Sequence, residues 1–214
     1  MTVAEVGVVT AGVVIAVGLW VFMFRLVRCD IWPRTWVAAA ALATYSVVTT
    51  ALRDDARTLV GRVSLAEVLI GAAIGVLWVA TTHLGAALLG RVVPSFGRQT
   101  SDLYRLANRS TAARVAGPLV AMAIAEELFF RGLIQARAGL VAAVVIYAGV
   151  QLVEGKWALV AAAALGGLVW GGLFCWREGL IAPSIAHALW TVTLTLVWPI
   201  RSAAHVAPAP RTPG

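Results

Sequence analysis

Two adjacent glutamates and an arginine interrupt an apolar run in the second half of the chain. The segment Val115–Gln135 contains no charged residues except Glu126, Glu127 and Arg131. A charge at the bilayer centre costs about 2.5 to 3.5 kcal/mol, so charged groups in such a helix indicate a functional site. On a helix, Glu127 and Arg131 are four residues apart and can pair, whereas Glu126 points elsewhere. We therefore expect Glu126 to be free for chemistry.

The alternative is that these charges mark a helix end at the headgroup level. Arg131 would then extend its charged tip toward the membrane surface. Only eleven uncharged residues precede Glu126, however, which is too few to cross a hydrocarbon core of about 30 Å. The short run of uncharged residues before Glu126 therefore favours a position of both carboxylates inside the hydrocarbon core.

Two later apolar runs carry polar pairs at helical spacing. Tyr147 and Gln151 are four residues apart, as are His187 and Thr191. Buried polar groups in a membrane bundle need partners, so we expect these faces to meet in one water-containing cavity. There Glu126 could act as general base on a water, with His187 and Thr191 as donors to an oxyanion. Taken singly, each polar residue is also explained as a hydrogen bond between helices.

These residues resemble the motifs of a known family, the CPBP intramembrane proteases, which includes type II CAAX prenyl endopeptidases and bacterial Abi homologues. The segment Glu126–Arg131 matches the motif EExxxR. His187 and Thr191 match a later HxxxN motif in part, and Tyr147–Gln151 stands where the family has FxxxH. The similarity runs from about Gly117 to Trp198.

The resemblance implies an all-α membrane bundle that hydrolyses peptide bonds, located as a multi-pass protein in a bacterial cell membrane. Its substrate would be a membrane-tethered peptide or protein. Glu126 would be the base, His187 and Thr191 the oxyanion donors, and Glu127 with Arg131 supporting groups. A metal-ligating role is also implied, which makes zinc a candidate cofactor with Glu126 and His187 as ligands.

Gln151 is the main departure from the family pattern. Glutamine neither accepts a proton nor ligates zinc as imidazole does, so this position would keep only the orientation of a water. Thr191 in place of Asn is milder, because its hydroxyl still donates. We therefore favour metal-independent hydrolysis driven by Glu126.

The composition is that of a polytopic membrane protein. Of 214 residues, 61% are hydrophobic and 13% are charged, against about 25% charged residues in soluble domains. The net charge of +7 does not indicate nucleic-acid binding, because the basic residues are spread singly through loops. We expect membrane lipid, rather than nucleic acid, to be in contact with the surface of this chain. The two cysteines predict neither a disulfide framework nor a thiolate metal site.

The apolar runs predict an all-α bundle of about seven membrane spans. They are Val6–Phe24, Thr35–Leu52, Val68–Gly90, Val115–Gln135, Ala138–Val153, Trp157–Trp176 and Gly179–Ile200. Lys and Arg are more numerous on one side, which predicts an outer N-terminus and an inner C-terminus. The glycines at 166, 167, 171 and 172 predict close approach of a neighbouring backbone.

The predicted organisation has three parts. Residues 1–114 would form N-terminal transmembrane helices and a cytoplasmic loop, with the polar stretch 91–114 as that loop or a short interfacial helix. Residues 115–200 would form the CPBP-like protease core, and the proline-rich 201–214 a disordered tail.

Three functions remain open from the sequence. The first is an intramembrane endopeptidase. The second is a catalytically impaired relative that acts as a membrane binding or immunity protein, because Gln151 stands in place of the histidine of the family motif. The third is a small proton-linked carrier with Glu126 and His187 as a relay, although no self-similarity between the two halves supports it. The sequence does not predict the oligomeric state.

Overall fold

The part of the chain that the structure describes folds as helices. The structure is a computed structural model, and it describes residues 1–25, 30–52, 60–61, 63–93, 95–96, 99 and 110–200. Its elements are α1 (Val3–Phe24), α2 (Ile31–Ala51), α4 (Leu65–Val92), α6 (Ala112–Glu126), η1 (Glu127–Gln135), α7 (Ala136–Val150), η2 (Gln151–Glu154), α8 (Trp157–Arg177), α9 (Ile181–Val192) and η3 (Thr193–Val197). The predicted all-α class is confirmed.

The predicted count of seven spans is not confirmed. Among the described residues, four helical stretches are long and apolar enough to cross a bilayer: Val3–Phe24, Leu65–Val92, Ala112–Glu154 and Trp157–Arg177. The fourth and fifth predicted spans fall in one continuous stretch of 43 residues, and the last predicted span corresponds to the shorter apolar helix Ile181–Val197. The chain is a membrane protein whose exact number of crossings stays a prediction.

Two predicted segments fall wholly or mostly outside the described residues. These are the disordered tail at 201–214 and most of the polar stretch at 91–114. From that stretch, the Gln99 Oε1 atom accepts a hydrogen bond from the Ala158 backbone N–H at 3.1 Å. Ser110 accepts one from the Trp32 indole at 2.9 Å. These two contacts tie it to α8 and α2.

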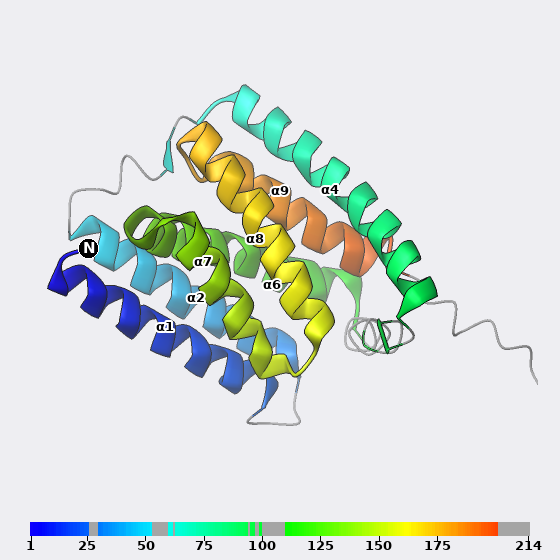
Figure 1. Cartoon of the computed structure of the whole chain (residues 1–214), viewed down its shortest axis with the longest axis horizontal. Coiled ribbons are helices and arrows are strands. Elements are labelled where there is room, and N and C mark those ends of the chain that lie inside the picture. The colour runs from blue at the N-terminus through cyan, green and yellow to red at the C-terminus, as the bar shows by residue number, and fades with distance from the viewer. Residues whose placement is uncertain are drawn as a thin grey trace, which may run out of the picture.

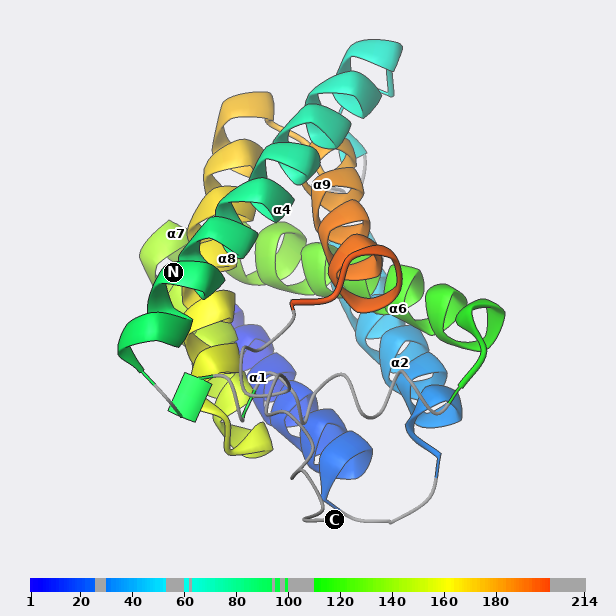
Figure 2. The ribbon, with the colours of Figure 1, turned by 90° about the vertical axis from the view of Figure 1, so that its right-hand side faces the viewer.

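The helix formed by α6 and η1 crosses the middle of the molecule. Figure 2 shows it between α1 and α2 on one side and α4, α8 and α9 on the other. It packs against α2 and α9, and η1 also packs against α7. The charged segment found in the sequence is therefore surrounded by other helices.

A glycine allows α7 to fold back on η1. Gly139 has φ 83° and ψ 169°, inside what is otherwise continuous helix. A positive φ of this kind is accessible to glycine at little cost. Because the chain turns here, the helix before Gly139 and the helix after it pack side by side. The predicted boundary between the fourth and fifth spans, at residues 136–137, lies near this turn.

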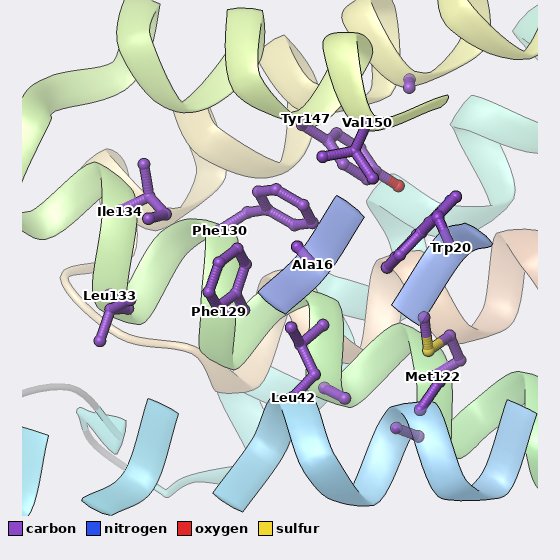
Figure 3. Packing of buried hydrophobic residues seen from close by; sticks show 14 of the residues in the cluster. Ala16, Trp20, Leu42, Met122, Phe129, Phe130, Leu133, Ile134, Tyr147 and Val150 are labelled. Atoms are coloured by element: carbon purple, nitrogen blue, oxygen red, sulfur yellow. The ribbon is translucent and has the colours of Figure 1, made fainter. Parts of the chain in front are cut away.

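The main apolar core lies between α1, α2, η1 and α7. Figure 3 shows Phe129 and Phe130 of η1 between Ala16 of α1, Leu42 of α2 and Tyr147 of α7. Both phenylalanine side chains are completely buried. This core fixes η1 relative to α7, and so fixes the charged residues on the same helix.

Close backbone packing occurs on α4 rather than on α8. A Cβ at Gly71 would lie 2.6 Å from the Ala182 carbonyl oxygen, and one at Gly75 would lie 3.0 Å from that of Ala186. The two helices run side by side in Figure 1. On α8, the atoms nearest to Gly166, Gly167 and Gly171 belong to side chains. The expected backbone approach at α8 was therefore wrong, because bulky side chains fill that space.

Candidate active site

The two adjacent glutamates lie where the helix changes its winding. Glu126 is the last residue of α6, and Glu127 is the first residue of η1. The η1 segment is a π-helix, a rare form that occurs frequently at functional sites. Eight of its nine residues are buried. The sequence ELFFRGLIQ carried no sign of this winding.

The π-helix aligns Glu127 with Arg131. Its wider turn brings residues four apart closer to one line than an α-helix does. The Arg131 Nε atom lies 3.2 Å from the Glu127 Oε2 atom, and both side chains are at most 1% exposed. The predicted ion pair is present. Because a buried charge without a partner is costly, each of these residues holds the other in place.

His187 of α9 lies between the two carboxylates. Its Nδ1 atom is 2.8 Å from the Glu127 Oε1 atom, and its Nε2 atom is 3.8 Å from the Glu126 Oε2 atom. The first distance is a hydrogen bond. The second is too long for one, but a single water placed off the line would contact both atoms. His187 therefore presents one ring nitrogen to each glutamate.

Tyr147 of α7 is the direct partner of Glu126. Its hydroxyl donates a hydrogen bond to the Glu126 Oε2 atom at 2.6 Å. The Arg131 guanidinium carbon lies 5.0 Å from the centre of the Tyr147 ring, within the range of a cation–π contact. Three helices thus join in one cluster: α6 with η1, α7 and α9.

The last two predicted residues, the buried Gln151 and the half-buried Thr191, do not join this cluster. The Gln151 Oε1 atom accepts a hydrogen bond from the Trp20 indole N–H of α1 at 3.2 Å. The Thr191 Oγ1 atom is enclosed and has no hydrogen-bond partner among the described residues. Within that part of the chain, neither side chain bonds directly to Glu126 or His187.

The charges of the cluster are unequally shared. Glu127 has both Arg131 and His187 within 3.2 Å. Glu126 accepts a hydrogen bond from a neutral hydroxyl and faces the Nε2 side of His187. When both nitrogens of His187 carry a proton, the four charges cancel. Glu127 is therefore held by ionic partners, whereas the Glu126 carboxylate can still accept a hydrogen bond from a water or a substrate.

The arrangement does not suit a catalytic zinc ion held by this chain's own side chains. Such sites usually have three protein ligands, and no three His, Cys, Asp or Glu side chains among the described residues gather in that way. The physical reason is that Glu126 and Glu127 lie at different nitrogens of one imidazole ring. Glu126 and His187 alone would supply two ligands.

Sequence reasoning missed the tryptophans that hold the site residues. The Trp170 ring of α8 stacks on His187 at a centroid distance of 5.6 Å and an interplanar angle of 18°. The Trp20 indole N–H donates a hydrogen bond to Gln151, which is 131 residues further along the chain. Tyr147 was noted only as the companion of Gln151. In apolar runs, tryptophans at these positions give no signal that separates them from core residues.

An open groove on the outside of the bundle is separate from this cluster. It has a volume of about 630 Å³ and is lined by Ile15 of α1 and by α2 residues that include Tyr45 and Val48. None of the predicted site residues lines it.

Comparison with known proteins gives a family for the segment that carries the site. Residues 108–193 match the family model described as Type II CAAX prenyl endopeptidase Rce1-like. The matched segment includes all six predicted site residues, from Glu126 to Thr191. No curated protein and no solved structure gave a significant match. Residues 108–193, which carry the site, are therefore similar to the Rce1-like type II CAAX prenyl endopeptidases.

Proposed function

We propose that this chain is an intramembrane endopeptidase that hydrolyses a peptide bond of a membrane-tethered substrate. The observation that supports this most directly is the environment of Glu126. Its Oε2 atom lies 3.8 Å from the His187 Nε2 atom and accepts one hydrogen bond, from the neutral Tyr147 hydroxyl. A water beside this pair would have a carboxylate to take its proton.

In the proposed reaction, Glu126 removes a proton from the water as its oxygen attacks the substrate carbonyl carbon. The tetrahedral intermediate carries a negative oxygen, which the Nε2–H of doubly protonated His187 and the Thr191 hydroxyl stabilise. Protonated Glu126 then gives the proton to the leaving nitrogen as the C–N bond breaks. The products are an amine and a carboxylic acid, which then loses its proton to water, so Glu126 serves first as base and then as acid.

The neighbouring residues would position these groups. Tyr147 fixes the rotamer of Glu126 through its 2.6 Å hydrogen bond. Glu127 fixes the orientation of His187, because its carboxylate accepts from Nδ1–H and leaves Nε2–H toward Glu126. Arg131 balances the charge of Glu127. No step in this scheme passes through a metal ion.

Cleavage by the purified full chain in proteoliposomes tests the proposal. CAAX-type peptides with a farnesyl chain, a geranylgeranyl chain or none would be incubated in water enriched in oxygen-18. Mass spectrometry should find one labelled oxygen in the new carboxylate. The Glu126→Ala variant should cut at least about 10³-fold more slowly with an unchanged circular dichroism spectrum. Undiminished cleavage by that variant would rule out the assignment of Glu126.

A second candidate function is a membrane binding protein without catalysis. It is favoured by Gln151, which bonds to Trp20 and has no proton-accepting nitrogen where the family motif has histidine. This candidate predicts no cleavage of any peptide by the wild-type chain, together with saturable binding of a lipidated peptide. Cleavage that requires Glu126 would exclude it.

A further inference from the structure

Gln151 is fixed by a tryptophan from outside the family-matched segment. The Trp20 indole N–H donates to its Oε1 atom at 3.2 Å, and both side chains are buried, at 2% and 8% exposed. An indole nitrogen can only donate a hydrogen bond. The amide atom facing Trp20 must therefore be the oxygen, which settles which way the amide is turned.

This orientation leaves the amide N–H₂ group turned away from Trp20. The Gln151 Nε2 atom has no hydrogen-bond partner among the described residues, and it is not among the atoms that protein encloses completely. Buried polar groups in proteins are nearly always paired, with protein, water or ligand. Two N–H donors are thus free for a molecule that enters the site.

The spacing along the chain places Gln151 on the same helix face as Tyr147, the partner of Glu126. Gln151 lies one helical turn after Tyr147, whose hydroxyl bonds to Glu126. Figure 3 shows the Tyr147 hydroxyl directed to the side where Trp20 lies, with Trp20 next to Met122. Met122 in turn is one helical turn before Glu126 on α6. The Trp20–Gln151 contact therefore lies one helical turn from Tyr147 and beside Met122, which is itself one turn from Glu126.

We infer that Gln151 is a hydrogen-bond donor to the carbonyl oxygen of the substrate, and that Trp20 is the positioning residue that orients it. This rests on the proposed function and extends it. A glutamine cannot replace a histidine as a base, but its N–H group can hold the oxygen on which negative charge develops. The site then uses a fixed neutral donor where the family motif has a titratable ring, and α1 completes it from outside residues 108–193.

The first test is a double-mutant cycle on the full chain in proteoliposomes. Gln151→Met keeps the length of the side chain but removes both donors, and it should lower kcat by about 10²-fold. Trp20→Phe removes the indole N–H and should lower kcat by about tenfold. Because Trp20 acts through Gln151, the double variant should be no slower than Gln151→Met alone. Additive losses would show that Trp20 acts on the fold instead.

A matched control separates orientation from packing. Trp32 of α2 also donates from a buried indole to a side chain, Ser110, at 2.9 Å. Trp32→Phe should lower the thermal unfolding midpoint about as much as Trp20→Phe while kcat stays unchanged. Full activity in Gln151→Met, with cleavage still abolished in Glu126→Ala, would overturn this inference and leave the proposed function standing.

A spectroscopic readout does not depend on turnover. A peptide labelled with carbon-13 at the scissile carbonyl, bound to the Glu126→Ala variant, should show its C=O stretch shifted to lower frequency by the hydrogen bond. Adding Gln151→Met should remove most of that shift. An unshifted carbonyl with Gln151 intact, or the same shift after its removal, would contradict the donor role even if the wild-type chain cleaves nothing.

Discussion

Among the described residues, Glu67 and Glu127 are buried glutamates that pair with arginines, and the two pairs differ in their further contacts. Glu67 of α4 accepts from both the Nε and Nη2 atoms of Arg177 at the end of α8, and the arginine remains 27% exposed. Glu127 pairs with Arg131 in full burial and also bonds to His187. The first pair joins α4 to α8 and, within the described part of the chain, has no further contact with the cluster. The second pair contacts His187, which in turn faces Glu126.

The comparison teaches which carboxylate is structural. Glu67 is satisfied by one arginine near a helix end, where solvent reaches the guanidinium. Glu127 has an ionic contact with Arg131 and a hydrogen bond with His187 at the centre of the bundle, whereas its neighbour Glu126 accepts from the neutral Tyr147 hydroxyl. The partly exposed Glu67–Arg177 pair, called here the rim pair, joins two helices, whereas the central Glu127–Arg131 pair orients the His187 imidazole.

Breaking the central pair should have the largest effect. Arg131→Met leaves the Glu127 carboxylate buried without its guanidinium, and we expect a loss of about 3 to 5 kcal/mol in stability together with loss of cleavage. Thermal unfolding in detergent and the peptide assay measure the two. The double variant Arg131→Met with Glu127→Gln should recover much of the stability but no activity. Recovery of cleavage would show that the pair is not needed to orient His187.

Removing the imidazole should affect catalysis more than folding. His187→Gln should lower kcat by about 10² to 10³-fold, because it removes an oxyanion donor beside Glu126. His83 is the matched control: it is half-buried, its Nε2 atom contacts the carbonyl oxygen of the exposed Trp198 at 3.0 Å, and it lies far along the chain from the cluster. His83→Gln should leave kcat unchanged. Equal losses in both variants would contradict a specific role for His187.

The tyrosine next to Glu126 should have a smaller effect. Tyr147→Phe removes the 2.6 Å hydrogen bond to Glu126 and should lower kcat by about tenfold, since a neutral donor to a charged acceptor is lost. Tyr45→Phe removes a comparable hydrogen bond to the Val8 carbonyl oxygen at 2.7 Å and should change stability without changing kcat. If both variants cut at the wild-type rate, Tyr147 does not position the base.

The rim pair should have the smallest effect on the reaction. Arg177→Gln removes the contact with Glu67 between α8 and α4. Cleavage should stay within about twofold of wild type, because partly exposed pairs contribute little and this one does not reach the cluster. The peptide assay and a thermal melt in parallel check this. A tenfold fall in kcat would mean that the two glutamate–arginine pairs are not functionally separate.

The sequence predicted the contacts that depend only on spacing within one helix. The four-residue interval fixed the Glu127–Arg131 contact, and the polar pairs on later spans indicated that α7 and α9 turn polar groups inward. It could not predict that His187 would bond to Glu127, nor that Trp20 would hold Gln151. Those contacts depend on how helices far apart in the chain pack together. The π-helical winding of η1 likewise has no signature in the sequence ELFFRGLIQ.

The glycines illustrate the same limit. A glycine-rich run on α8 looked like a backbone contact surface, yet Trp170 and Leu140 fill the space beside it. The close approach is at Gly71 and Gly75 of α4, against α9. Which glycine-bearing face meets a neighbour is decided by the side chains opposite, and these are known only once the helices are arranged.

The central position of α6 and η1 has a consequence for how the protein enters the membrane. A lone segment with two carboxylates and a guanidinium would meet an energetic barrier in hydrocarbon, since each charge is costly there. In the finished molecule, other helices surround this segment and supply its polar partners. Its biogenesis should therefore be cooperative, with the charged helix held at the insertion machinery until α7 and α9 have been synthesised to shelter it.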